Sequence, residues 1–206
     1  MSQDPVPPLP SSDVSTPKAI MAAAFGVFVQ YGYKRTSMED IAQAAQMSRP
    51  ALYLHFRNKE DIYRRMVAAH FSAHVEGVSA ALAGAGSPAS RLEAALLSTL
   101  GPVTEVLLTS PHGAELLDAG TQVGGDTVAQ GNAALQRVYA DWVRAEQAVG
   151  RIDPRQDADL IGWTIVLGAL GLKQPPYGCY RDRLICLAQV IGAGLSAARP
   201  SAAPLP

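Results

Sequence analysis

The chain is poor in cysteine and in charged residues, and it has no long apolar run. Two cysteines among 206 residues cannot hold a fold together, which excludes a disulfide-stabilised secreted domain. Only 17% of the residues are charged, but a hydrophobic content of 48% is ordinary for a globular protein and excludes wholesale disorder. The longest apolar run, Leu160 to Leu172, is interrupted by glycine and threonine and is shorter than the roughly 17 residues of a membrane span. The sequence therefore predicts a globular protein without a membrane segment.

The two ends of the chain differ in composition from the rest. Residues 1–15 are rich in proline, and residues 1–17 contain no basic residue. A secretory signal starts with basic residues and continues with an apolar run, so none is indicated. We expect residues 1–15 and 199–206 to be flexible tails and the protein to be cytoplasmic.

The charge changes sign along the chain, although the formal net charge is −1. Residues 18–66 carry eight Lys or Arg and four Asp or Glu, which gives +4. The segments on either side are acidic, with −2 for residues 1–17 and −3 for residues 67–206. A basic block attracts phosphate backbones. Charge alone leaves open a second interpretation, a surface that is uneven by chance.

Apolar periodicity and capping residues predict nine helices and no strand, and therefore an all-α fold. The first four helices are predicted at 17–31, 37–45, 49–56 and 59–82. Each has a residue suited to an N-cap at its start, and these residues are, in order, Thr16, Ser37, Ser48 and Asn58. Asp40, three residues after Ser37, completes a capping box. The remaining helices are predicted at 89–108, 112–119, 126–149, 154–172 and 180–198.

Two short helices joined by a turn at residues 46–48 form a helix-turn-helix pattern. The surrounding run, Phe28 to Tyr63, reads FVQYGYKRTSMEDIAQAAQMSRPALYLHFRNKEDIY. It resembles the DNA-binding domain of TetR-family (TetR/AcrR-like) transcriptional regulators in several spaced groups: Gly32-Tyr33, Thr36-Ser37-Met38, Ile41-Ala42, Ser48, Leu52-Tyr53-Leu54-His55-Phe56 and Asn58-Lys59-Glu60. The resemblance covers roughly residues 14–74, and beyond residue 80 it depends only on length and helix count.

The resemblance implies a division into two domains. Residues 16–66 are expected to form the DNA-binding domain, with the helix-turn-helix at about 37–56, and residues 67–198 a helical regulatory and dimerisation domain. It implies a homodimer through the last two long helices, for which an ordinary intrachain core is the alternative. A pocket for a small-molecule inducer of unknown identity is expected among the middle helices, with His112, Tyr139 and Trp142 as candidate lining residues.

The resemblance also implies how DNA is bound. The third helix is expected to enter the major groove, where Arg49 would read a guanine edge and Pro50 and Ala51 would touch a thymine methyl. The other expected contacts, mainly to phosphates, come from Thr36, Ser37, Met38, Ser48, Tyr53, His55 and Lys59. Alternatives stay open for five of these residues: helix capping for Thr36, Ser37 and Ser48, and packing for Tyr53 and His55. The implied function is a repressor that binds a pseudo-palindromic operator as a dimer and is released by its inducer.

One residue departs from the family pattern. Members usually carry glycine in the turn where Gln46 stands. If that position requires a positive φ, a residue other than glycine costs about 1–2 kcal/mol there.

No catalytic or cofactor motif is present, since the sequence contains no G-x-S-x-G, Walker loop, CxxC or HExxH. We therefore expect no enzyme activity and no cofactor. His70 and His74 have metal-ligand spacing, but without a third ligand a structural role is favoured. Cys179 and Cys186 would lie about 10 Å apart along a helix, too far for a disulfide. The competing hypothesis is an all-α small-molecule-binding protein or enzyme in which the basic N-terminal block is incidental.

Overall fold

The computed structural model of this protein describes residues 16–174 and 176–195. These residues form nine α-helices and one short 3-10 helix, and they contain no β-strand, which confirms the predicted all-α class. In chain order the helices are α1 (Pro17–Tyr31), α2 (Met38–Ala44), α3 (Arg49–His55), α4 (Lys59–Leu82), α5 (Pro88–Ser98), α6 (Pro102–Thr109), α7 (Gly113–Ala148), α8 (Ala158–Gly171), η1 (Tyr177–Cys179) and α9 (Tyr180–Leu195).

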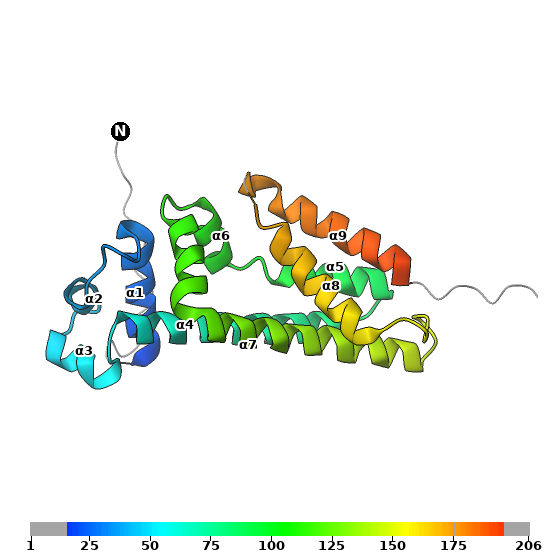
Figure 1. Ribbon diagram of the computed structural model, residues 1–206, viewed down its shortest axis with the longest axis horizontal. Coiled ribbons are helices and arrows are strands. Elements are labelled where there is room, and N and C mark those ends of the chain that lie inside the picture. Colours follow the sequence, from blue (N-terminus) through cyan, green and yellow to red (C-terminus); the bar gives the residue numbers. More distant parts are fainter. Residues whose placement is uncertain (1–15, 175, 196–206) are drawn as a thin grey trace, which may run out of the picture.

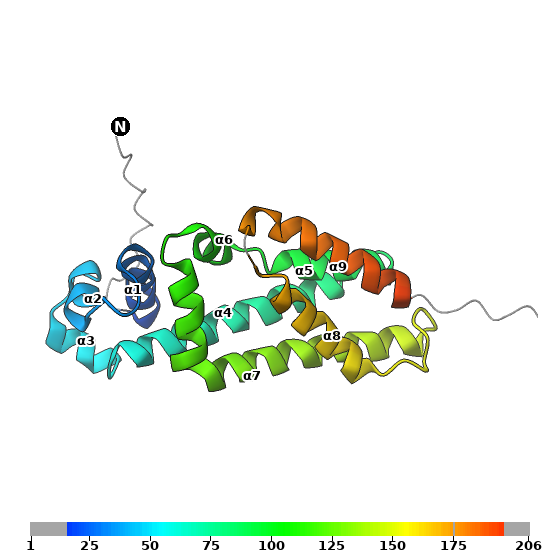
Figure 2. The same ribbon diagram turned by 45° about the horizontal axis from the view of Figure 1, so that its top comes forward.

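The molecule is elongated, with a small head at one end and a larger body (Figure 1). The head consists of α1, α2, α3 and the first turns of α4, and the body consists of the rest of α4 with α5 to α9. Figure 2 shows the two longest helices, α4 and α7, lying side by side along the body. Helix α9 packs along α5, and α8 packs against α7.

The head helices begin where the sequence predicts, because each first turn has a side-chain cap. Thr16, Ser37, Ser48 and Asn58 each accept a hydrogen bond from the backbone N–H three residues further on, at 2.8–3.3 Å. These bonds satisfy N–H groups that lack a partner within the helix. At the other end of α1, Gly32 has a φ of 83°, a conformation that glycine adopts without strain. Helices α2 and α3 end one residue earlier than predicted.

The head has its own hydrophobic core, to which every head helix contributes. Phe28 of α1, Ile41 of α2, Leu52 of α3, Phe56 just after α3 and Ile62 of α4 are all completely buried. The predicted inward-facing pair, Leu52 and Phe56, is therefore confirmed. Because one face of α3 is fixed in this core, its opposite face points outward.

Helix α4 belongs to both parts of the molecule. Ile62 and Tyr63 pack in the head core, whereas Val78 and Leu82 of the same helix pack in the body core. The boundary predicted at residue 66 therefore falls inside one continuous helix. Helix α4 therefore connects the two cores without a break.

Two predictions about the body helices are wrong. The single helix predicted at 89–108 is two helices, α5 and α6, because Gly101 and Pro102 interrupt it. The helices predicted at 112–119 and 126–149 are one helix of 36 residues, α7. Within the predicted break, Gly120 faces Tyr63 of α4 and Gly124 faces Val67 of α4, and further along α7 a Cβ at Gly131 would overlap the Phe71 ring. They allow two long helices to approach closely rather than ending one of them.

The last helices also differ from the predicted limits. Helix α8 begins at Ala158 rather than at residue 154, because Asp157 caps it by accepting from the backbone N–H groups of Asp159 and Leu160. Helix α9 is described to Leu195. The predicted tails at 1–15 and 199–206, and the predicted end of the last helix at 198, lie outside the described residues.

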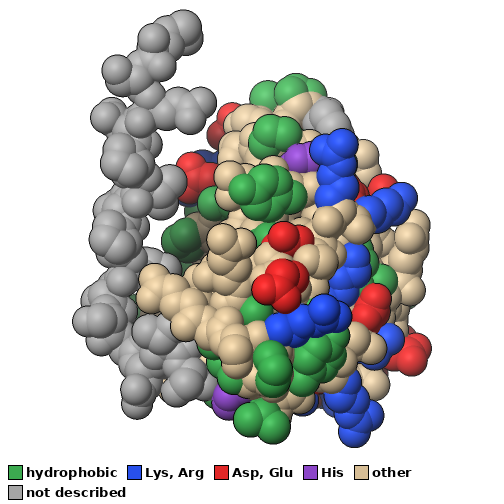
Figure 3. All heavy atoms as spheres, turned by 90° about the vertical axis from the view of Figure 1, so that its left-hand side faces the viewer, with side chains coloured by type: hydrophobic (Ala, Val, Ile, Leu, Met, Phe, Trp, Pro, Cys, Tyr) green, Lys and Arg blue, Asp and Glu red, His purple; other side chains and the backbone are tan. Residues whose placement is uncertain are grey.

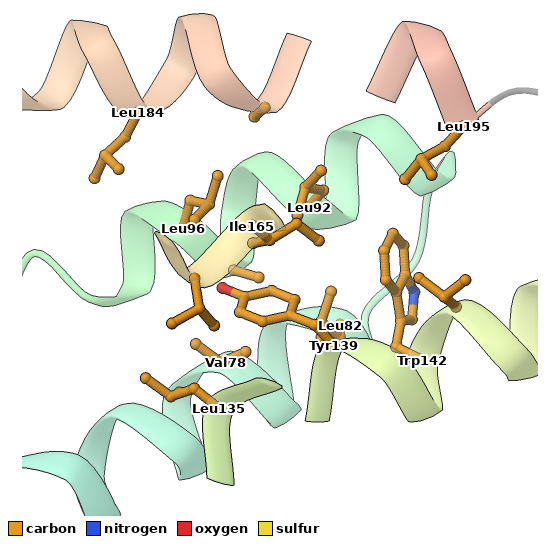
Figure 4. Close-up of a cluster of buried hydrophobic side chains, with 14 of the residues drawn as sticks. Val78, Leu82, Leu92, Leu96, Leu135, Tyr139, Trp142, Ile165, Leu184 and Leu195 are labelled. Carbon is orange, nitrogen blue, oxygen red and sulfur yellow. The ribbon is translucent and has the colours of Figure 1, made fainter. Parts of the chain in front are cut away.

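The body core lies between α4, α5, α7, α8 and α9. In Figure 4 the Tyr139 ring of α7 lies among Val78 and Leu82 of α4 and Leu92 and Leu96 of α5. Beside this core Glu146 of α7 is buried and accepts hydrogen bonds from two arginines. Arg91 Nη1 lies 2.7 Å from Glu146 Oε1, and Arg151 Nε lies 2.6 Å from Glu146 Oε2.

No single helix among the described residues has the length and apolar content needed to cross a bilayer. Helices α5 and α6 reach that length only together, across a bend of 63°. Cys179 and Cys186 are both free thiols, in agreement with the spacing argument.

Candidate nucleic-acid interface

The outward face of α3 is the candidate nucleic-acid interface. Arg49, Pro50, Tyr53 and Leu54 are exposed on it, and Ala51 and His55 are partly exposed. Figure 3 looks onto the end of the molecule formed by the head, where Lys and Arg side chains form a band with a few carboxylates between them. The helix therefore presents polar and apolar groups, on a head in which Lys and Arg outnumber Asp and Glu by eight to four over residues 18–66.

Arg49 and Tyr53 form a pair, one helical turn apart. Arg49 Nη2 donates to the Tyr53 hydroxyl at 3.4 Å, and the guanidinium carbon lies 5.7 Å from the ring centroid. The hydrogen bond raises the pKa of Arg49 above its ordinary value, so the side chain stays charged. Arg49 is exposed and this is the one side-chain hydrogen bond it makes with the described residues, so its other guanidinium N–H groups remain available for bidentate reading of a guanine edge.

The start of α2 contributes less exposed side-chain surface than the sequence predicts. Ser37 is exposed, but Asp40 Oδ2 accepts from its hydroxyl at 2.7 Å and from its backbone N–H at 2.8 Å. These bonds lower the pKa of Asp40. The Thr36 hydroxyl is buried and donates to the Gly32 carbonyl at 2.7 Å, and Met38 lies in the head core. Thr36 and Met38 therefore lie near the interface but do not present side chains to it.

Lys59 lies at the start of α4 and joins it to the loop between α1 and α2. Its ammonium group donates to the carbonyls of Tyr33, Lys34 and Thr36 at 2.9, 3.3 and 2.9 Å. It also lies 4.7 Å from the Tyr33 ring centroid. All three N–H groups have protein acceptors, so Lys59 positions this loop. Its contact with phosphate stays a prediction.

Leu54 is a surface residue that the sequence-based prediction did not assign to the interface. It is 85% exposed, although it belongs to the short helix between the two core anchors Leu52 and Phe56. Helical spacing alone could have predicted this exposure. Leu54 is two residues from each anchor, so it lies on a different face of the helix from Leu52 and Phe56. An exposed leucine beside Arg49 and Tyr53 adds an apolar contact to the face.

Three contacts tie the head to the start of α7. Glu115 Oε1 accepts from the backbone N–H of Lys34 at 2.8 Å, and Arg64 Nε donates to the Val123 carbonyl at 2.9 Å. The Tyr63 hydroxyl donates to the Leu116 carbonyl. The loop before α2 is thus held directly by a side chain of the body.

A second surface feature lies on α8. Four large hydrophobic side chains of this helix are exposed: Leu160, Trp163, Leu167 and Leu170. Their spacing of three, four and three residues places them in one stripe along the helix. On the neighbouring α9, Val190 is 67% exposed. A stripe of this kind in a monomer marks an interaction surface.

The body encloses a cavity of about 260 Å³, lined mostly by apolar side chains of α4, α5, α7, α8 and α9. Tyr139 lines it as predicted, whereas His112 and Trp142 do not, because they lie at the head contact and in the core beside Arg91. Tyr63 and Leu116, which hold the head to the body, line the cavity too.

His70 and His74 of α4 also line the cavity, with ring centroids 4.0 Å apart. Burial lowers the pKa of His70 to about 3 and that of His74 to about 4, so both imidazoles are neutral near neutral pH. Within residues 16–174 and 176–195, no group of three or more His, Cys, Asp and Glu side chains is arranged to hold a metal ion. No third metal ligand therefore accompanies the two histidines among these residues, and their structural role stays a prediction.

Comparison with known proteins identifies what the head resembles. Residues 20–66 match the family model described as "Bacterial regulatory proteins, tetR family". Over 77 residues the chain is 38% identical to the HTH-type transcriptional activator FasR of Mycolicibacterium smegmatis, covering 37% of this chain and 35% of that protein. Over 53 residues it is 36% identical to the probable acrEF/envCD operon repressor of Escherichia coli K12, covering 26% and 24%. These matches thus span about a third or less of the curated relatives.

The whole fold resembles solved structures. The structure of SmeT, described as the repressor of the Stenotrophomonas maltophilia multidrug efflux pump SmeDEF, matches with a TM-score of 0.68 and 18% identity over 94% of this chain and 99% of that chain. A complex of SmeT with triclosan matches with a TM-score of 0.66 and 20% identity, over 92% and 97%. At such low identity the match establishes a shared fold for head and body alike.

Proposed function

Because residues 20–66 match the TetR family of bacterial regulatory proteins, we propose that this chain is a member of that family and a sequence-specific DNA-binding repressor. It binds a pseudo-palindromic operator as a homodimer, and a small molecule bound in the body releases it. The observation that carries the proposal is the outward face of α3. A short helix anchored by Leu52 and Phe56 presents Arg49, Tyr53 and Leu54 to the outside, within a segment that matches a DNA-binding family.

The roles of the interface residues follow from their exposure. Arg49 reads a guanine edge in the major groove, and Pro50 and Ala51, with Leu54 beside them, contact thymine methyl groups. Residues with hydroxyl or imidazole groups contact phosphates and fix the position of the helix: Ser37, Ser48, Tyr53 and His55. Thr36, Met38 and Lys59 contribute through the backbone at the start of α2, which their side chains hold in place.

The dimer is supported by the apolar stripe of α8, whose four side chains face solvent in a single protomer. A twofold axis near this stripe pairs α8 and α9 with the same helices of a second copy. Such a dimer carries one head at each end. Two recognition helices about 34 Å apart then reach successive major grooves on the same side of a duplex.

Release by a ligand is supported by residues that line the cavity and also contact the head. Tyr63 and Leu116 do both, and Glu115 beside Leu116 holds the loop that leads into α2. A ligand that favours one spacing of α4 and α7 therefore favours one position of the heads. The SmeT fold, which this chain shares, accommodates triclosan, and this supports a small-molecule site in the body.

Selection of bound fragments from genomic DNA, followed by affinity measurements on variant operators, tests the proposal. Arg49→Ala should relax specificity at one base pair of each half-site and lose about 1–3 kcal/mol of binding free energy on the preferred operator. Arg137→Ala, which removes an exposed arginine of α7, is the matched control and should keep the wild-type profile.

Two results would contradict the proposal. The first is absence of selective binding to any genomic fragment at low ionic strength. The second is a profile of Arg49→Ala that weakens equally for every operator variant, because a uniform loss identifies a phosphate contact rather than a base contact.

A further inference from the structure

The cavity in the body contains a cationic side chain that has no counter-charge. Lys173 follows the end of α8 and is partly buried, and it lines the cavity together with His70 and His74. Its ammonium group makes no hydrogen bond and no ion pair with any of the described residues. The Lys173 Nζ atom lies 5.9 Å from the centroid of the Tyr180 ring.

The groups that face Lys173 from the surrounding helices do not neutralise it. Helix α4 contributes His70 and His74, whose pKa values of about 3 and 4 keep them neutral near pH 7. Helix α7 contributes Tyr139 and α9 contributes Tyr180, and burial raises the pKa of both phenols, so they stay protonated. No Asp or Glu is among the residues that line the cavity.

Desolvation lowers the pKa of Lys173 below 10.5, and the Lys173 charge in turn helps to lower the pKa of both histidines. A buried charge without a partner is costly, and a binding site retains one when the ligand supplies the opposite charge. Most of the remaining lining is apolar and includes Leu96 and Ile165, beside the polar residues Thr99, Thr104, Thr121 and Asn132, so it suits a hydrocarbon chain or ring.

We propose that the ligand of this cavity is an amphiphilic carboxylic acid, whose carboxylate pairs with Lys173 and whose apolar part lies between α4, α5, α7 and α8. The assignment of the ligand rests on the cavity alone, and only the regulatory effect of the ligand rests on the proposed function. The Tyr180 hydroxyl donates to the Ala169 carbonyl at 3.3 Å, which keeps its ring beside Lys173 and encloses that end of the cavity.

Binding of two matched pairs of compounds to the full-length protein, without DNA, tests the charge requirement. The pairs are decanoate with methyl decanoate, and 2-naphthoate with methyl 2-naphthoate. In each pair the hydrocarbon part is constant, and the ester replaces the negative charge with one methyl group. Calorimetric titration should give at least one carboxylate that binds about ten- to a hundredfold more tightly than its ester.

Lys173→Met removes the charge and keeps an unbranched apolar side chain, so it should abolish the preference for the carboxylate while ester binding persists. Lys18→Met, on the exposed start of α1, changes the net charge equally and should keep the wild-type preference. Equal affinity within both pairs, no binding of any of the four compounds, or an unchanged preference in Lys173→Met would each overturn the inference.

Operator binding by the ligand-free protein is measured separately, and it separates the two proposals. Selective carboxylate binding by a protein that ignores DNA keeps the ligand assignment and refutes the regulator. Operator binding by a protein that shows no carboxylate preference keeps the regulator and refutes the ligand assignment.

Discussion

Gln46 lies in the turn between α2 and α3 with a φ of 53°, and it is the one residue other than glycine with a positive φ among those the structure describes. The positive φ that the sequence comparison suggested for this position is therefore confirmed, and it is a backbone conformation that glycine adopts without strain. The side chain is exposed and makes no hydrogen bond that its loss would break. Gln46→Gly is thus a clean test of backbone strain.

The expected gain is the difference between two opposing effects. A left-handed conformation costs an L-residue about 1–2 kcal/mol, and glycine removes this cost. Glycine also makes the unfolded chain more flexible, which reverses roughly 0.4–1 kcal/mol of the gain. We therefore expect Gln46→Gly to raise the free energy of unfolding by about 1 kcal/mol, equivalent to a rise of roughly 2–4 °C in the melting temperature of a chain of this length.

Chemical denaturation followed by circular dichroism measures the effect. Ala44→Gly is the matched control, because Ala44 is the exposed last residue of the neighbouring α2, where glycine should cost up to about 1 kcal/mol. The two substitutions should therefore move the midpoint in opposite directions. A loss of stability in both variants would show that the turn stores no strain at Gln46. Operator affinity should not change, because the turn keeps its geometry.

Two further predictions concern the body. Leu167→Glu places a charge in the middle of the apolar stripe of α8 and should convert the proposed dimer into a folded monomer in analytical ultracentrifugation. Val149→Glu, at an equally exposed site beyond α7, should leave the proposed dimer intact. A dimer that persists in Leu167→Glu would exclude this stripe as the interface. Glu146→Gln leaves Arg91 and Arg151 without their carboxylate and should cost about 3 kcal/mol of unfolding free energy at neutral pH. The pKa of Glu146 is lowered below its ordinary value of 4.5, and the hydrogen bond from Arg151 is the largest cause. The carboxylate therefore stabilises the fold fully above pH 4.5, and this stabilisation is lost as the pH falls through the lowered pKa. Unfolding curves of wild type and variant should therefore converge in acid; a constant difference down to pH 2 would contradict this role.

The sequence predicts the head well because the head is specified by local interactions. Each cap is a contact between a side chain and a backbone group three residues away, so Ser37, Ser48 and Asn58 mark helix starts in any tertiary context. The buried pair Leu52 and Phe56 follows from helical spacing alone. Exposure of Arg49 then follows, because a short helix that buries one side must expose the other.

The body was predicted less accurately because its features depend on packing between distant helices. Gly120, Gly124 and Gly125 disfavour a continuous α7 when only local preferences are considered, but α7 packs along α4, where Gly120 faces Tyr63 and Gly124 faces Val67. Lys59 was expected to be a surface charge, and its three carbonyl acceptors come from the loop before α2, 23 to 26 residues away.

The sequence by itself determined the helical class, the capped starts of the head helices and the regulator family that the head resembles, because short-range contacts and matching motifs carry that information. Only the tertiary structure decided which side chains meet in the body. It brought Lys173 to His70 and Tyr180 around one cavity, and it left the α8 stripe exposed. The physical reason is that burial, and with it the energetic cost of a charge or an apolar surface, depends on segments that are far apart along the chain.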